Sequence, residues 1–318
     1  MVDAFSRIIR LGEGVSSSGR LSAEAMDRTV DALRVCASKL ARFNTRRSRL
    51  VATEACRVAA NGREFLDRVD RELGLGIEIL TPETEAHLAV SGCVSLIDDS
   101  ADYVLVFDIG GGSSEIIWLD LTRAAAPEAG ETIKVEECMV AWTSLSVGVV
   151  TLAEKYGGKN VTPEIFETMV AHVGEMINEF ESRHQVRARI ADGRVHMLGT
   201  SGTVTTVAGI QLGLPRYDRN RVDGCWLVTD DVRSVTATLL GQTYEQRIAQ
   251  PCIGRDRADL VLAGCAILEG FLRMWPCDRL RVADRGLREG ILATLMREDG
   301  VYRSGFRPRN SRPPGDQS

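Results

Sequence analysis

Two carboxylates enclose a run of glycines and serines near the middle of this chain, in the stretch Asp108-Ile109-Gly110-Gly111-Gly112-Ser113-Ser114-Glu115. Short apolar runs at 103–107 and 116–119 flank it and predict a strand, a tight turn and a returning strand. Because glycine has no Cβ, a backbone of this kind can approach an anion closely and direct several N–H groups at it. We therefore interpret the stretch as a phosphate-binding loop, with a plain β-hairpin as the alternative, and its candidate phosphate-binding residues are Gly110, Gly111, Gly112, Ser113 and Ser114.

The acidic ends of this stretch need a separate chemical reason. A carboxylate such as Asp108 would repel a phosphate unless a cation lay between them, and Mg²⁺ is the expected cation because it prefers oxygen ligands. Glu115 follows the loop directly and can orient a water molecule. The stretch therefore predicts a magnesium-linked phosphate site.

A second loop of the same composition follows the apolar run 195–198, in Gly199-Thr200-Ser201-Gly202-Thr203, and a helix is expected after it. This order places an anion on the N–H groups of a helix N-terminus. The alternative is a strand-to-helix turn closed by glycines, and the sequence alone does not separate the two. The candidate phosphate-binding residues in this loop are Gly199, Ser201, Gly202 and Thr203.

Composition narrows the class of protein. The chain has 318 residues, 44% hydrophobic and 26% charged, with a net charge of −5. These values are typical of a soluble globular protein of two domains and do not indicate a DNA-binding protein. The eight cysteines form no CxxC pair, the four histidines lack metal-ligand spacing, and no apolar run reaches the ~20 residues that span a bilayer. We expect a cytoplasmic protein with reduced cysteines, no zinc and no membrane partner.

The elements that position these residues alternate between helix and strand in the first third of the chain. A helix is expected from Ser22, a strand at 48–53 and another at 77–80. Asn61 and Glu64 have the spacing of a capping box, which opens a helix that Gly74 ends. Thr81 as N-cap and Pro82 at the first helical position start a further helix through Leu96. Such alternation predicts an α/β layer.

A second α/β domain is expected beyond the polar residues 98–100. Its predicted strands are 103–107, 116–119, 132–140, 195–198 and 279–283, and its predicted helices are 149–156, a long one from Thr162-Pro163, 204–212, 257–275 and a last one ending near Met296. We place the domains at 1–97 and 98–300 and expect residues 301–318 to form a disordered tail. The charged connection 215–223 reads as a largely solvated loop, although five arginines are candidates to face a substrate: Arg216, Arg219, Arg221, Arg255 and Arg257.

Five motifs in order make the chain resemble the exopolyphosphatase and guanosine pentaphosphate phosphohydrolase (Ppx/GppA) family over about residues 4–296. They are Ala52-Thr53-Glu54-Ala55-Cys56-Arg57, the strand 77–80 with Glu85-Ala86, Asp108 to Glu115, Gly199 to Thr203, and Leu287-Arg288-Glu289-Gly290. The resemblance implies two RNase H-like domains of the actin, sugar kinase and Hsp70 type with an interdomain phosphate-binding cleft. It also implies Mg²⁺-dependent release of the terminal phosphate of polyphosphate or pppGpp, and it makes a homodimer plausible.

The resemblance assigns roles to particular residues. Glu85 and Glu115 match the family's two catalytic carboxylates, Asp108 matches the metal-linked aspartate, and Arg57 matches a basic residue that contacts phosphate. From the residues alone, Glu85 would be read as a first-turn glutamate favoured by the helix dipole, and Arg57 as a surface arginine. Phosphoryl transfer depends mainly on positioning and charge neutralisation, which these residue types supply.

One departure from the family concerns the start of the chain. Family members open with a strand, turn and strand of the form Asp-hydrophobic-Gly-Ser/Thr-Asn-Ser, and this sequence begins beyond that first phosphate loop. We expect a start assigned too late rather than a real truncation. The alternatives to the hydrolase are a catalytically impaired relative that binds polyphosphate or an alarmone and, less favoured, an ATP-dependent kinase or ATPase of the actin-like fold.

Overall fold

The structure, a computed structural model, describes residues 3–98, 100–123 and 135–301. The chain divides into two compact units, and the division falls between Pro82 and Glu83. The predicted domain boundary at 97/98 lies one helix later. The helix in question belongs to the second unit because its buried residues Ala86, Val90 and Cys93 share a core with the sheet of that unit.

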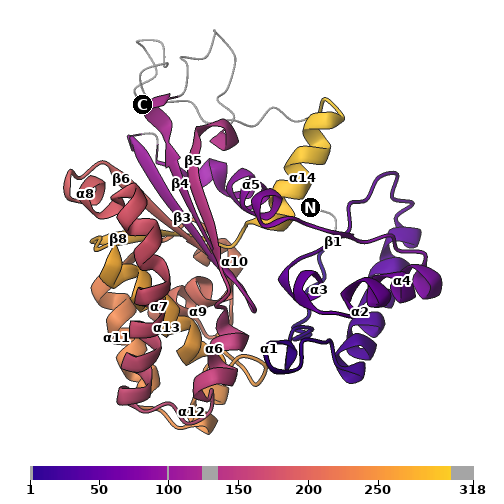
Figure 1. Ribbon diagram of the computed structural model, residues 1–318, viewed down its shortest axis with the longest axis horizontal. Helices are drawn as coiled ribbons and strands as arrows, with labels where there is room; N and C mark the ends of the chain where they lie inside the picture. Colours follow the sequence, from indigo (N-terminus) through magenta and orange to yellow (C-terminus); the bar gives the residue numbers. More distant parts are fainter. Residues whose placement is uncertain (1–2, 99, 124–134, 302–318) are drawn as a thin grey trace. The chain divides into compact units, whose positions relative to one another are not determined.

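The first unit is a small α/β layer (Figure 1). Its elements are α1 (Val15–Ser18), α2 (Ala23–Arg42), β1 (Val51–Ala52), α3 (Glu54–Val58), α4 (Gly62–Leu73) and β2 (Glu78–Ile79). Strands β1 and β2 are parallel, with Val51 opposite Glu78. Helix α2 begins after Ser22, whose hydroxyl accepts a hydrogen bond from the Ala25 N–H at 3.1 Å. One apolar face each of α2 and α4 forms the core, which includes Val30, Phe65 and Val69.

The predicted capping box at Asn61 is wrong, although helix α4 itself is present. The Asn61 side chain makes no cap hydrogen bond. It accepts from the Leu21 N–H at 2.8 Å and donates to the Leu21 carbonyl at 3.0 Å. The side chain therefore fixes the chain that leads into α2, a contact between residues forty positions apart that local sequence rules do not reveal.

The second unit is built on a six-stranded mixed sheet of order β5-β4-β3-β6-β8-β7. The strands are β3 (Tyr103–Ile109), β4 (Ser114–Asp120), β5 (Met139–Leu145), β6 (Val195–Thr200), β7 (Trp226–Val228) and β8 (Arg279–Ala283). Strands β3, β6 and β8 are parallel, and the outer strands are antiparallel to their neighbours. The carboxyl ends of the three parallel strands therefore meet at one edge of the sheet.

Helices cover both faces of this sheet (Figure 1). They are α5 (Pro82–Cys93), α6 (Val149–Tyr156), α7 (Pro163–His184), α8 (Val186–Ala191), α9 (Gly202–Gln211), α10 (Arg219–Val222), α11 (Thr229–Leu240), α12 (Tyr244–Ala249), α13 (Val261–Met274) and α14 (Leu287–Glu298), with 3₁₀ turns η1 (Val94–Leu96), η2 (Leu121–Arg123) and η3 (Val135–Cys138). Leu105 and Phe107 on β3 pack with α7 and α13, whereas Val104 and Val106 pack with α5. Alternate residues of each strand therefore serve opposite faces.

Most long elements of the second unit agree with the sequence predictions. Thr162 caps α7 through its hydroxyl, and the predicted inward residues Phe166, Met169, Val173, Ile177 and Phe180 are all buried. The predicted strand 132–140 is wrong over Val135–Cys138, which form a 3₁₀ turn, and β5 begins only at Met139. Residues 132–134 and all of the predicted disordered tail except Val301 lie outside the described residues.

No helix among the described residues is long and apolar enough to cross a membrane.

Candidate active site

Asp108 and Glu115 face each other across the β3–β4 hairpin, because they are partners in its antiparallel ladder. The connection between the strands closes when the Gly110 N–H donates to the Ser113 carbonyl at 2.9 Å. We call residues 110–113 the glycine turn. A Cβ on Gly110 would lie 2.8 Å from the Ser113 carbonyl oxygen, so only glycine fits there. The predicted hairpin is confirmed, and it brings two acids to the carboxyl edge of the sheet.

The glycine turn is held by the start of helix α6. Val149 and Val150 donate their N–H groups to the carbonyls of Gly110 and Gly111 at 2.9 and 2.8 Å. A Cβ on Gly148 would lie 2.4 Å from the Gly111 carbonyl carbon, so the two backbones touch. No acceptor among the described residues takes the N–H groups of Gly111, Gly112 and Ser113. The carbonyls of the glycine turn thus accept hydrogen bonds within the protein, and its row of N–H donors suits an anion.

The two serine hydroxyls of this stretch donate within the protein. Ser114 is buried and donates to the Val147 carbonyl at 2.6 Å, which ties β4 to the chain after β5. Ser113 donates to Glu115 Oε1 at 2.7 Å. The sequence indicates both as candidate phosphate-binding residues, which stays a prediction; in this structure their hydroxyl protons are donated to protein acceptors.

Glu115 is held in place by two hydroxyls. Its side chain is buried, and Oε1 accepts from Ser113 Oγ at 2.7 Å and from Ser144 Oγ at 2.9 Å. Ser144 lies opposite Glu115 on β5. Hydrogen bonds to a carboxylate oxygen fix its orientation. Sequence reasoning missed Ser144, because its role depends on strand register.

Asp108 lies in an acidic environment. Burial, the Glu115 carboxylate and the Glu85 carboxylate together raise the pKa of Asp108 to about 7. Glu85 is in the first turn of α5, which covers the same face of the sheet as Asp108. Like charges gathered in a partly buried place lack compensation without a cation. The described residues contain no group of three metal-ligating side chains, so a cation here would need other oxygen ligands.

Glycines allow α5 to approach the chain that follows β8. A Cβ on Gly92 would lie 2.0 Å from the Gly286 carbonyl oxygen, and one on Gly290 would lie 1.9 Å from the Leu88 carbonyl oxygen. A Cβ on Gly286 would itself lie 4.0 Å from Asp108 Oδ2. These contacts give a physical reason for the glycines in the Asp284 to Gly290 stretch. The close backbone contact between α5 and this stretch fixes the position of α5 and therefore of Glu85.

The second glycine and hydroxyl loop begins where β6 ends. Thr200 pairs with Asp108 in the ladder and donates its hydroxyl to the Arg285 carbonyl at 2.8 Å. Ser201 has φ of 119°, in the left-handed region, and its hydroxyl accepts from the Thr203 N–H at 3.2 Å. Helix α9 therefore begins beside Asp108, and a Cβ on Gly202 would lie 3.3 Å from Arg257 Nη1. The prediction of a loop that leads into a helix start is confirmed.

Two of the predicted residues in this loop are explained by packing. Gly199 lies within β6, where a Cβ would meet the Phe107 ring at 2.7 Å. Thr203 is buried, and its hydroxyl oxygen would lie 2.3 Å from a Cβ on Gly264. Their side-chain positions therefore serve the core beneath the loop.

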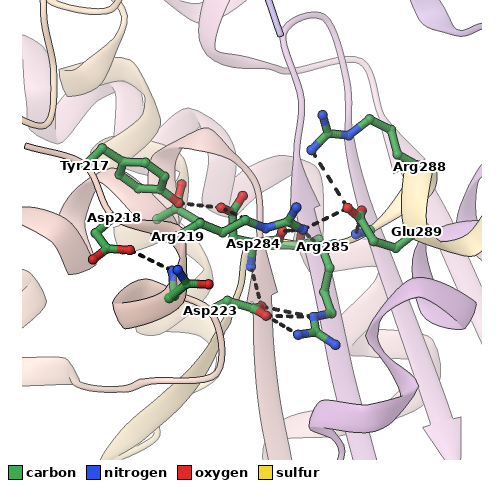
Figure 2. A network of polar contacts seen from close by, with 12 residues as sticks. Tyr217, Asp218, Arg219, Asp223, Asp284, Arg285, Arg288 and Glu289 are labelled. Carbon is green, nitrogen blue, oxygen red and sulfur yellow. Dashed lines mark hydrogen bonds and ion pairs between the residues drawn. The ribbon is translucent and has the colours of Figure 1, made fainter. Parts of the chain in front are cut away.

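A network of charged residues braces the turn between β8 and α14 (Figure 2). Arg285 binds Asp223 with Nε at 2.9 Å from Oδ2, and Arg219 donates to Glu289 Oε1 at 2.8 Å and to the Asp284 carbonyl. Tyr217 donates to Asp284 Oδ2 at 2.7 Å. In the 215–223 connection, Arg216 and Arg221 are exposed, as expected of a solvated loop. Arg219 and Asp223 are partly buried and bind residues of the β8–α14 turn. Glu289 also accepts from the Gly286 N–H at 3.0 Å. These charged groups therefore bind partners within the second unit.

Arg57 lies in the first unit, on α3. Its guanidinium forms an ion pair with Glu54 and donates from Nη1 to the Leu80 carbonyl at 2.8 Å. The side chain is only 19% exposed. It therefore joins α3 to the end of β2, a structural role that the surface reading did not foresee.

Comparison with known proteins relates this arrangement to a family. The sequence profile of the Ppx/GppA phosphatase family matches residues 1–299. Exopolyphosphatase 2 of Mycobacterium tuberculosis is 28% identical over 299 residues, which cover 91% of this chain and 88% of that protein.

Solved structures agree with the sequence comparison. A crystal structure of an exopolyphosphatase-like protein is 29% identical with a TM-score of 0.81, covering 92% of this chain and 90% of that one. The Ppx/GppA family member of Aquifex aeolicus is 28% identical with a TM-score of 0.70, covering 92% and 88%. The expected α/β fold is confirmed, and the chain belongs to the Ppx/GppA phosphatase family.

Proposed function

We propose that this protein hydrolyses phosphoanhydride bonds and releases the terminal phosphate of inorganic polyphosphate, of pppGpp, or of both. The observation that carries the proposal is the row of N–H donors at Gly111, Gly112 and Ser113 beside the carboxylates of Asp108 and Glu115. Such a row accepts phosphate oxygens, and the acids beside it can hold a cation and a water molecule. The name of the relative in Mycobacterium tuberculosis, exopolyphosphatase 2, supports polyphosphate as a substrate.

The glycine turn would hold the terminal phosphate. Its backbone donors need no rearrangement when charge develops on the phosphoryl oxygens, because α6 already fixes the carbonyls of the turn. The N–H groups at the start of α9 supply a second set of donors for a neighbouring phosphate. Arg57 stays a candidate phosphate ligand by resemblance, and it would then bind both Glu54 and the phosphate.

Glu85 and Glu115 would act on the attacking water. Glu115 is held by Ser113 and Ser144, which suits a residue that orients water through a fixed oxygen. Glu85 would accept the proton as the water oxygen bonds to the terminal phosphorus and the bond from phosphorus to the bridging oxygen breaks. The shortened chain leaves with the electron pair of that bond.

Mg²⁺ fits the residues present. The Glu115 and Glu85 carboxylates are close enough to raise the pKa of Asp108, and all three side chains offer oxygen donor atoms. Mg²⁺ is commonly bound by one or two carboxylates together with water and phosphate oxygens, so Asp108 would hold it without a cluster of three acids. When bound, it would neutralise charge on the phosphoryl oxygens.

The experiment that tests the proposal measures phosphate release from long-chain polyphosphate, pppGpp and ATP, each with Mg²⁺ and with a chelator. We expect Mg²⁺-dependent release from polyphosphate, pppGpp or both, and much slower release from ATP. Release from ATP alone would contradict the proposal and favour an ATPase of the same fold. Binding of polyphosphate without any release, in a protein shown to be folded, would favour a binding protein.

Two further expectations belong to this proposal. A homodimer is testable by light scattering during gel filtration, and a monomer at micromolar concentration would contradict it. A cytoplasmic location is testable by fractionation of cells that produce the protein.

A further inference from the structure

A cavity lies at the edge of the second unit's sheet opposite to Asp108, where the parallel strands begin. Its volume is about 370 Å³, and its lining includes His196 at the start of β6, Trp226 on β7, Arg279 at the start of β8, and Asp98, Arg194 and Cys277. This volume is in the range of small-molecule sites. His196 and Thr200 are the near and far ends of the same strand, roughly 13 Å apart at strand spacing, so this cavity is separate from the candidate active site.

His196 carries a buried donor without a partner. The residue is 5% exposed, and its Nδ1 accepts a hydrogen bond from the Asp98 N–H at 2.9 Å. Nδ1 therefore has no proton, and in the neutral ring Nε2 carries it. Burial lowers the pKa of His196 to about 4, which agrees with a neutral ring. Nε2 is buried and finds no partner among the described residues. An N–H in this position calls for an acceptor.

Two arginines stand beside this donor around the Trp226 ring. The guanidinium carbons of Arg279 and Arg281 lie 4.1 and 5.0 Å from the ring centroid, and the His196 ring centroid lies 5.2 Å from it. Nε of Arg281 is also buried without a partner. No described carboxylate is within ion-pair distance of either guanidinium. Two buried donors without a partner, His196 Nε2 and Arg281 Nε, and two guanidinium groups without an ion pair among the described residues are thus gathered here.

Two aspartates line the cavity, Asp98 and Asp278, and neither bonds to the unpartnered His196 Nε2 or Arg281 Nε. The Asp98 carboxylate accepts from the N–H and hydroxyl of Ser100 at 2.9 and 2.6 Å. Arg194, the other cation of the lining, is already paired with Asp102 at 2.7 Å. Arg279 is therefore the cation of the lining that is left for a ligand, and its guanidinium can present two parallel N–H donors to an oxyanion.

We infer that this cavity binds a small oxyanion, a phosphate or a carboxylate group, between His196 Nε2–H and the Arg279 guanidinium. Such a group consists of acceptors only and satisfies both a neutral donor and a cation. Because the cavity is larger than one phosphate group, the oxyanion is carried by a larger molecule or enters with its water. The indole of Trp226 supplies an apolar wall for the rest of that molecule.

The test follows the imidazole signals of the full chain by NMR while inorganic phosphate is added, and separately while acetate is added. The chain has four histidines, so His196 is assigned by substituting the other three in turn. We expect saturable shifts of the His196 signals with an affinity on the order of millimolar, and a rise of the pKa of this imidazole when the anion is bound. The arm that shifts the signals identifies the source as phosphate or carboxylate.

Substitution of an arginine separates this site from any other anion site. Arg279→Ala is expected to weaken the His196 response about tenfold, the effect of losing one charge-assisted contact. Arg183→Ala, an exposed arginine paired with Glu179 on α7, is the matched control and keeps the response. If Arg279→Ala unfolds the chain, Arg279→Lys provides the second variant, with an intermediate loss. Unchanged His196 signals with both anions, or an equal response in Arg279→Ala, would overturn the inference and leave a cavity that holds only water.

Discussion

Asp108 and Glu115 are opposed residues of one β-hairpin, and their side chains leave the same face of the sheet. That face is the one covered by α5, which carries Glu85. Paired acids in a ladder are unfavourable for folding, since like charges directly opposite each other repel. The hairpin therefore carries a cost in stability that a site for a cation and a phosphate would explain.

The cost can be measured with Asp108→Asn. Since the pKa of Asp108 is raised from 3.8 to about 7, the folded state keeps a proton that the unfolded chain releases. The favourable contribution of protonated Asp108 to the free energy of unfolding is complete below about pH 4 and is lost as the pH rises through 7. Without Mg²⁺ at pH 8, we expect Asp108→Asn to raise the free energy of unfolding by about 2 kcal/mol, a value discounted for the partial exposure of the side chain. Urea unfolding at pH 8 and pH 4 measures it, with no gain at pH 4.

Mg²⁺ provides the control for that comparison. The cation is expected to stabilise the wild-type protein at pH 8 in proportion to its binding and to leave Asp108→Asn nearly unchanged. Asp102 lies just before β3 and forms an ion pair with Arg194. The variant Asp102→Asn should therefore keep the Mg²⁺ effect. A stabilisation of equal size in wild type and Asp108→Asn would show that Asp108 does not hold the cation.

The glycine contact between α5 and Gly286 should be indispensable for placing Glu85. In Gly92→Ala the new Cβ would lie 2.0 Å from the Gly286 carbonyl oxygen, so α5 must move. We expect a loss of about 3 kcal/mol in unfolding free energy, as in overpacked cores, together with a large loss of phosphate release. Gly174→Ala is the matched control, because nothing lies within 4 Å of its Cβ in α7, and it should gain about 0.5–1 kcal/mol. Equal stability of the two variants would refute the close contact.

Ser144 is expected to act through Glu115. Ser144→Ala removes one of the two hydroxyl groups, those of Ser113 and Ser144, that donate to Oε1. It should lower kcat about tenfold with little change in KM, because it loosens a group that orients water rather than phosphate. Steady-state kinetics on polyphosphate measure both constants. Thr143→Ser on the same strand serves as the control and should keep the wild-type kcat. A rise in KM at constant kcat would assign Ser144 to substrate binding instead.

The free energy of unfolding at mildly acidic pH should depend on the protonation of His196. Its pKa is lowered from 6.5 to about 4 by burial, with Asp98, Arg279 and Arg281 as the charged neighbours. The contribution is complete above pH 6.5 and is lost as the pH falls towards 4, because the unfolded chain takes up the proton first. The loss reaches about 2–3 kcal/mol at pH 4. His196→Gln and His196→Asn should both flatten the fall in unfolding free energy over this range, and profiles parallel to wild type would contradict the buried neutral ring.

Local rules of sequence were sufficient for the hairpin at Asp108 and for α7, whose hydroxyl cap, proline and apolar spacing all agree. They failed at Asn61, whose side chain bonds to the Leu21 backbone, and at Val135–Cys138, where the end of the predicted strand forms a 3₁₀ turn. The resemblance to a family supplied Glu85, which the structure places near Asp108. Ser144 and Gly92 depend on strand register and on the packing of α5, so their roles became visible only in three dimensions.

The central claim is that the carboxylate of Glu85 acts on the water in a phosphoanhydride hydrolase, and one comparison tests it most directly. Glu83 and Glu85 share the first turn of α5, and Glu83 is exposed. Phosphate release from polyphosphate with Mg²⁺ should fall by about 100-fold or more in Glu85→Gln, with polyphosphate binding retained, and stay within about twofold of wild type in Glu83→Gln. Equal rates for the two variants, with measurable release by the wild type, would contradict the account.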